Sequence, residues 1–132
     1  MVSLNNSCGN IVTFKTPSIN NEQIHPNINI LFLSLVNDLP LSADPLFFTS
    51  NFRSVKYMAP GEHFTMITNF DIKWITLYWS RNNAPRCAFV SLYLPRYEGN
   101  HQKIYWSVRL DGIYHSWDNV NWDRRVTWGH CY

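Results

Sequence analysis

The sequence has few charged residues and almost no net charge. Charged side chains make up 15% of the 132 residues, and the formal net charge is +2. So low a charged fraction argues against a disordered tail or a solvated helix, which usually carry many charges. The chain also lacks the clustered Lys and Arg side chains that nucleic-acid binding requires. We therefore expect no nucleic-acid partner.

Cysteine is scarce as well. The three cysteines are Cys8, Cys87 and Cys131. No two of them form a C-x-x-C pair, which leaves zinc-binding and thioredoxin-type motifs without support. Three cysteines allow one disulfide and leave one thiol over, so their number does not fix the redox compartment. Whether Cys87 pairs with Cys131 stays open at this point.

No apolar run is long enough to cross a bilayer. The best one, residues 28–36, is too short for a transmembrane helix. The first ten residues have neither the basic region nor the apolar region of a secretory signal. We expect no membrane insertion. From the residues alone, the chain either stays inside the cell or is a mature form that carries an added Met1.

Aromatic residues are in excess. Six Trp, seven Tyr and eight Phe make up 16% of the chain, and such side chains favour pleated strands. Residues 1–27 are rich in Asn, Ser and Pro and predict an irregular segment. Over residues 28–132, short apolar runs separated by turn residues predict a single all-β domain, an antiparallel β-sandwich of about eight short strands. The expected strands cover residues 27–37, 44–52, 62–70, 73–80, 86–95, 102–110, 112–117 and 125–132.

The clearest local signal is the stretch YWSVRLDGIYHSWDN, residues 105–119. Asp111 and Gly112 between two alternating runs predict a β-hairpin with a type I′ turn. A turn centred there would pair Trp106 with Trp117 on the apolar face of the hairpin. We interpret the stretch as a half-buried hairpin that contributes side chains to the core, and not as the lining of a catalytic site.

Few residues suggest chemistry. His115 lies on the apolar face of the predicted hairpin, where a general base is one interpretation. We favour a neutral core histidine that hydrogen-bonds to the backbone or to a neighbouring Trp. The chain has no G-x-S-x-G motif, Cys87 falls in a strand pattern typical of a buried thiol, and the nine carboxylates are scattered. We expect a protein that is not an enzyme and needs no metal or cofactor.

The aromatic excess supports an alternative function. Exposed Trp and Tyr on a β-sandwich stack against sugar rings in carbohydrate-binding modules. The candidates for such a role are Trp74, Trp79, Trp122 and Trp128. Most of these rings are instead expected to fill the space between the two sheets. A lectin-like module is therefore the second hypothesis.

Several segments follow one another in a distinctive order. They are LVNDLP, PLFFTS, APGEHFTMITNF, ITLYWS, AFVSLY and YWSVRLDGIYHSWDN, followed by Trp122. From about Ile28 to the C-terminus, this set resembles the plant self-incompatibility S-protein homologue family. The resemblance implies a small, secreted, non-enzymatic β-sandwich protein. Its role would be that of a signalling ligand that a cell-surface partner recognises, as in pollen rejection.

The cysteines depart from the pattern of that family. Its members usually carry cysteines near Phe48 or Thr49 and at the position of Ser80, with a further pair before and at the start of the hairpin. This chain has none at these places. Each missing crosslink would cost about 2–4 kcal/mol of stability, which we expect the aromatic core to replace. A cytoplasmic location is therefore the alternative to the secretion that the resemblance implies.

For a ligand, the loops are expected to carry recognition, because the strands are committed to the core. The polar stretch at residues 96–103 combines charges of both signs with a Tyr and a Gly, and residues 81–86 are the second choice. The candidate partner-binding residues are Arg96, Tyr97, Glu98, Asn100, His101, Lys103, Arg81 and Arg86. We expect these side chains to be exposed, dispensable for folding and available to a protein partner such as a cell-surface receptor.

Overall fold

Strict alternation of buried and half-buried side chains defines the first strand. In β1, Leu31–Asn37, every second residue points into the core, as a pleated strand with one covered face requires. The computed structural model describes residues 30–131, so the irregular segment expected over residues 1–27 lies outside the described residues. The other elements are β2 Leu46–Ser50, β3 Lys56–Met58, β4 His63–Thr68, β5 Lys73–Arg81, β6 Ala84–Tyr93, α1 Pro95–Glu98, β7 Lys103–Arg109, β8 Gly112–Ser116, β9 Asp123–Val126 and β10 Gly129–His130.

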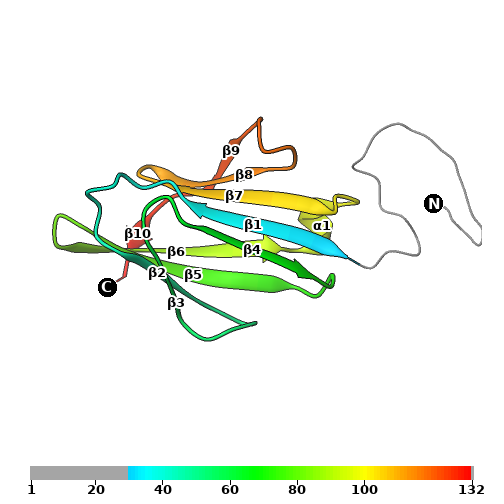
Figure 1. Ribbon diagram of the computed structural model, residues 1–132, viewed down its shortest axis with the longest axis horizontal. Coiled ribbons are helices and arrows are strands. Elements are labelled where there is room, and N and C mark those ends of the chain that lie inside the picture. The colour runs from blue at the N-terminus through cyan, green and yellow to red at the C-terminus, as the bar shows by residue number, and fades with distance from the viewer. Residues whose placement is uncertain (1–29, 132) are drawn as a thin grey trace, which may run out of the picture.

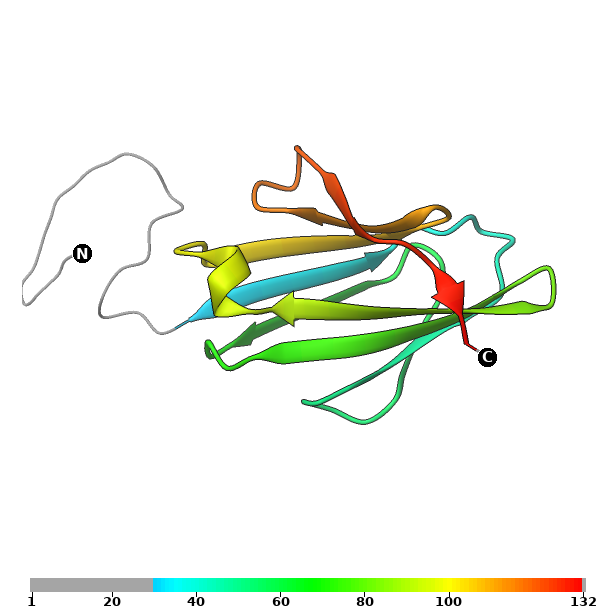
Figure 2. The same cartoon turned by 180° about the vertical axis from the view of Figure 1, so that it is seen from behind.

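Two five-stranded sheets pack face to face, which confirms the predicted all-β sandwich (Figure 1). The first sheet has the order β4-β1-β7-β8-β9 and the second the order β10-β6-β5-β2-β3. The chain passes from the first sheet to the second between β9 and β10, as Figure 2 shows from behind. The core is formed by the inner faces, with Leu33, Phe48 and Ile75 among its buried side chains. Each such side chain contributes roughly 1.5–3 kcal/mol through removal from water.

Two details of the predicted sandwich were wrong. The structure has ten strands within residues 30–131 instead of about eight, because the short β3 carries no clear signal and the last predicted strand is divided into β9 and β10. In addition, β1 and β7 run parallel, whereas every other pair of neighbouring strands is antiparallel. Strand direction between segments so far apart in the sequence leaves no local signature.

The type I′ turn lies in a different hairpin from the predicted one. It connects β5 to β6, where Arg81 pairs with Ala84 and only Asn82 and Asn83 remain between them. Both asparagines have positive φ, 53° and 65°, as this turn requires and as Asn tolerates. The predicted loop over residues 81–86 is therefore mostly strand.

The hairpin of β7 and β8 has a register different from the predicted one. Arg109 pairs with Gly112, so the turn residues are Leu110 and Asp111, and Trp106 pairs with His115 instead of Trp117. Gly112 is required for another reason. A Cβ at this position, where φ is 149°, would lie 2.5 Å from the carbonyl oxygen of Val126 on β9. The glycine thus allows the close approach of β9 to β8.

A disulfide joins Cys87 on β6 to Cys131, which follows β10. The pairing of Gly129 with Cys87 brings the two cysteines together, with their Cα atoms 5.2 Å apart. The question that the sequence left open is thereby answered. The third cysteine, Cys8, lies outside the described residues.

Replacing both bonded cysteines, Cys87→Ser with Cys131→Ser, should lower the free energy of unfolding by about 2–4 kcal/mol, because the unfolded chain regains the freedom of a long closed loop. Urea denaturation monitored by Trp fluorescence measures the change. The matched control is Cys8→Ser, which leaves the disulfide intact. Equal stability of the double variant and the control would contradict this prediction.

Candidate functional site

The predicted partner-binding residues fall into two groups at opposite ends of the molecule. Figure 1 places α1 at one end of the longest axis and the turn between β5 and β6 at the other. Arg81 ends β5 beside this turn, and Arg86 lies nearby on β6, where its guanidinium is 3.4 Å from Nδ1 of His130. The remaining six candidates belong to the α1 end. The eight residues therefore do not form one surface.

Glu98 corrects the prediction for the α1 end. It lies in a helical turn instead of a loop, and its side chain is only 1% exposed. Pro95 starts this turn and Gly99, with φ of 59°, ends it, a pattern that the sequence itself displays. Because Glu98 is buried, it is not available to a partner.

The other residues at the α1 end lie at the surface to different degrees. Arg96 and Tyr97 are exposed on α1, with the guanidinium 5.1 Å from the centre of the Tyr97 ring. Asn100 is exposed, and Lys103 is the exposed first residue of β7. His101 is half-buried and stacks on Trp117, with 3.9 Å between the ring centres.

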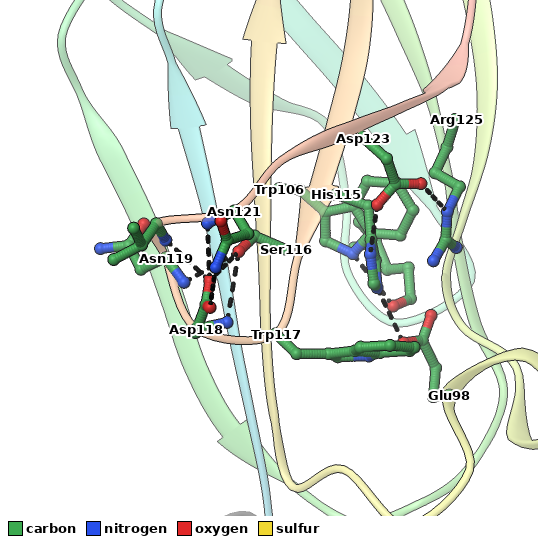
Figure 3. A network of polar contacts seen from close by, with 12 residues as sticks. Glu98, Trp106, His115, Ser116, Trp117, Asp118, Asn119, Asn121, Asp123 and Arg125 are labelled. Carbon is green, nitrogen blue, oxygen red and sulfur yellow. Dashed lines mark hydrogen bonds and ion pairs between the residues drawn. The ribbon is translucent and has the colours of Figure 1, made fainter.

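Glu98 belongs to a buried polar cluster with His115, shown in Figure 3. Its Oε1 accepts hydrogen bonds from Nε2 of His115 at 2.9 Å and from Nε1 of Trp117 at 2.8 Å. Nδ1 of His115 lies 3.5 Å from Oδ1 of Asp123, and the other carboxylate oxygen, Oδ2, accepts from Nε of Arg125 at 2.5 Å. The cluster therefore connects α1 with β8 and β9.

His115 is a buried histidine, as predicted, but its partner was predicted wrongly. A carboxylate, and not the backbone or a Trp, accepts its hydrogen bond. The rings of Trp106 and Trp117 contact the imidazole edge-to-face, with centres 4.9 and 5.2 Å away. Both ring nitrogens face carboxylates, and only 1% of the side chain is exposed. Within residues 30–131 the imidazole is thus enclosed between two carboxylates, an arrangement typical of a structural pair.

The four Trp residues proposed for sugar stacking have different surroundings. Trp79 is buried, and Trp128 packs against the core while its Nε1 donates to the carbonyl oxygen of Arg109 at 2.8 Å. Trp122 lies under the guanidinium of Arg109 at 5.1 Å. Only Trp74 is exposed on a strand. Trp79 and Trp128 thus serve the core, as most of these rings were expected to do.

A group of five rings lies on the outer side of the second sheet, and we call it the aromatic face. It crosses β3, β2, β5 and β6 and consists of Tyr57, Phe47, Tyr78, Phe89 and Trp74. Ring centres are 5.2 Å apart for Phe47 and Tyr57, 4.8 Å for Phe47 and Tyr78, and 5.8 Å for Trp74 and Phe89. Tyr57 is 65% exposed and Phe89 58%.

Sequence reasoning missed the aromatic face, although a signal for it is present. Along β5, Trp74 and Tyr78 alternate with the buried Ile75 and Leu77. In a two-layer sandwich only one side of such a strand faces the core. Large apolar residues on its other side therefore predict an apolar outer surface on this sheet.

Comparisons with protein-family models, curated proteins and solved structures found no match. Within residues 30–131, no group of three or more His, Cys, Asp or Glu side chains is arranged to hold a metal ion. No helix in the same range is long and apolar enough to cross a membrane.

Glu98→Ala should lower the free energy of unfolding by about 3–5 kcal/mol, since it leaves two buried donors without their charged acceptor. Glu98→Gln keeps an acceptor oxygen and should cost less. Urea denaturation measures both variants. The control is Asn100→Ala at an exposed position, which should stay within about 0.5 kcal/mol of the parent. A Glu98→Ala variant as stable as this control would show that the cluster does not hold α1 in place.

Asp118, in the loop between β8 and β9, should make stability depend on pH. Hydrogen bonds from the backbone of Asn121 and Val120, together with those from the side chains of Asn121 and Ser116, lower its pKa below the ordinary value of 3.8. Because the folded pKa is lowered, the stabilisation is complete above the ordinary pKa and is lost as the pH falls through the lower folded value.

The test for Asp118 compares the unfolding free energy of Asp118→Asn with that of the parent at several acidic pH values. The difference between them should be largest above about pH 4 and should shrink as the pH falls. The control is Asp44→Asn, at an exposed position with no hydrogen bond among the described residues. A constant difference between Asp118→Asn and the parent across this range would contradict the prediction.

Proposed function

We propose that this protein is a non-enzymatic recognition protein that binds another protein, such as a cell-surface receptor. The resemblance to the S-protein homologue family suggested this role, and the two-sheet sandwich is the fold that the resemblance implies. A rigid sandwich with a covered core suits a ligand, because it presents a fixed outer surface without a large ordering cost on binding.

The aromatic face is the observation that carries this proposal. Single exposed apolar residues are normal on a protein surface, but contiguous patches mark interaction sites. Here Phe47 contacts both Tyr57 and Tyr78 across three strands, and Trp74 contacts Phe89 on the same side of the sheet. Tyr, Trp and Phe are the residues enriched in the centres of protein interfaces.

The exposed residues near α1 extend the recognition surface in this proposal. β6 ends at Tyr93 and α1 starts at Pro95, so Arg96 and Tyr97 lie just beyond the end of the sheet that carries Trp74. Arg and Tyr are frequent in interface hot spots. The predicted loop site is thus retained in a reduced form, without Glu98.

We also propose that the protein acts outside the cell. The disulfide between Cys87 and Cys131 favours an oxidising compartment, because the cytosol keeps most thiols reduced. The buried position of Glu98 and His115 supports a non-enzymatic role, since the pair most suited to acid–base chemistry is closed to substrate. Both points agree with a secreted ligand.

The test screens the wild-type protein against a library of plant receptor ectodomains and then measures each binder with two variants. The face variant carries Tyr57→Ser and Phe89→Thr, and the α1 variant carries Arg96→Ala and Tyr97→Ala. Loss of two hot-spot side chains should weaken binding by at least about tenfold in the face variant, and less in the α1 variant.

The control variant, Ile67→Thr, removes an exposed apolar side chain from β4 in the other sheet. Its affinity should equal that of the wild-type protein, and thermal melting should be similar for all variants. Absence of any ectodomain binding, or binding that neither the face variant nor the α1 variant weakens, would refute the proposal.

A further inference from the structure

The four strands at the margins of the two sheets differ in how their open edges are protected. Proteins usually protect such edges with charged residues, bulges or very short strands. β9 consists of three charged residues and a valine, and it forms a bulge against β8. β3 has three residues including Lys56, and β10 has two. Beyond β10, β6 is linked to β7 by the indole N–H of Trp106, which donates to the carbonyl oxygen of Leu92. Three of the four edge strands thus carry a protection.

The edge of β4 has none of these protections. Among the described residues, β4 is the last strand of the first sheet and lies beside β1 (Figure 1). Its sequence, HFTMIT, has no Lys, Arg, Asp, Glu, Pro or Gly, and its six residues pair with β1 without a register shift. The side chain of Ile67 is 73% exposed. β4 is therefore a regular, uncharged edge of the kind to which another strand can add.

The alternation of hydrogen bonds identifies the main-chain groups that face this edge. The N–H of Phe32 on β1 donates to the carbonyl oxygen of Gln102, just before β7, so even-numbered residues of β1 bond to β7 and odd-numbered ones to β4. The odd-numbered residues of β1 pair with the even-numbered residues of β4. The main chains of the odd-numbered residues of β4 therefore point away from β1. These edge-facing residues are His63, Thr65 and Ile67.

The nearest loop leaves these groups unbonded. The loop between β2 and β3 reaches the inner side of β4, where Phe52 and Arg53 contact the ring of Phe64. These contacts are made by side chains. Within residues 30–131, no backbone hydrogen bond from a loop or turn reaches the edge-facing residues. The edge of β4 thus offers N–H and C=O groups that a further strand can satisfy.

We propose that β4 pairs antiparallel with β4 of a second copy of this chain, about a twofold axis through Thr65. Symmetry identifies the partner. Thr65 is the central edge-facing residue, so this axis places Thr65 opposite itself and His63 opposite Ile67 of the second copy. Every edge-facing N–H and C=O group of one copy then meets a partner on the other, and the core sides of both sheets lie on the same side.

The same pairing covers apolar side chains. On the inner side, Phe64 of one copy lies against Met66 of the other, and both side chains are half-buried at the margin of the core. On the outer side, Ile67 loses much of its exposure. Removal of these side chains from water adds to the backbone hydrogen bonds. A single pair of strands is nevertheless a small interface, so we expect a dimer that dissociates on dilution.

The distribution of charge favours a second copy through β4 and limits the assembly to two. Like charges directly opposite each other destabilise an antiparallel pair, whereas Thr opposite Thr is favourable. β4 brings Thr65 to the axis, while the charged β9 ends the combined sheet on both sides. The pairing uses the open edge of both copies, so it does not continue into a fibre. The aromatic face belongs to the other sheet, so the dimer does not depend on the proposed receptor binding.

Sedimentation equilibrium of the full chain, from about 10 µM to 1 mM, covers the range in which weak interfaces associate. The average mass should rise with concentration from 15.6 kDa toward twice that value. Hydrogen exchange followed by NMR should show that the amides of His63, Thr65 and Ile67 become slower as the dimer forms.

Two charge variants test the position of the axis. Thr65→Lys and Thr65→Glu each place like charges opposite each other, so each should raise the dissociation constant of the dimer by at least about tenfold. An equimolar mixture of the two should restore the dimer, because Lys then lies opposite Glu. Thr65 is exposed, and its main chain does not bond to β1, so both variants should melt as the parent does.

The matched control is Thr76→Lys, the same replacement on the outer side of β5 within the aromatic face. It should dimerise as the parent does. A dimer lost in Thr76→Lys and kept in Thr65→Lys would place the interface on the aromatic face and overturn the proposal. A mixture of the Lys and Glu variants that is no more dimeric than either alone would also overturn it.

A mass of 15.6 kDa at every concentration would exclude the second copy. In that case, slow exchange at the three edge-facing amides would assign the edge to another segment of the same chain, and fast exchange would leave it to a different protein. Either result would overturn the proposal.

Discussion

The first sheet depends on the parallel pairing of β1 with β7, which come from distant parts of the chain. In this register, Leu35 lies beside Trp106, and the indole N–H of Trp106 reaches across the core to the carbonyl oxygen of Leu92 on β6 at 3.1 Å. One pairing thus places the ring that links the two sheets. It also fixes β8, and with it the position of His115 beside Trp106.

The contacts of His115 explain why the acidic residue Glu98 lies in the turn between β6 and β7. Glu98 reaches inward from α1 and satisfies both His115 and Trp117 with one oxygen. A residue without an acceptor oxygen there would leave two donors unpaired in the core, which costs more than the burial of a well-bonded carboxylate. The polar cluster therefore fastens the crossing from β6 to β7. Recognition is left to the outer surfaces.

The fold class could be predicted from the sequence, but the partner of each strand could not. Alternation along β1 and β5 revealed strands with a core-facing side, because this pattern is local. The parallel partner of β1 and the burial of Glu98 depend on residues far away in the chain. The turn between β7 and β8 shows a third limit: Gly112 suggested a type I′ turn, but the constraint on it comes from Val126 on another strand. Of the predicted loop site, only exposed residues such as Arg96 and Tyr97 remain suitable for recognition, because exposure of a polar side chain depends on what folds against it.

The C-terminal segment affects whether one edge of the second sheet can pair with another copy of the protein. An open sheet edge presents unpaired N–H and C=O groups to any passing strand, and this is a common start of aggregation. β10 is only two residues long, yet it occupies the margin of β6 at Arg86 and Cys87. The disulfide between Cys131 and Cys87 prevents this short strand from separating from β6. β10 thereby prevents a strand of a neighbouring molecule from pairing with this part of β6.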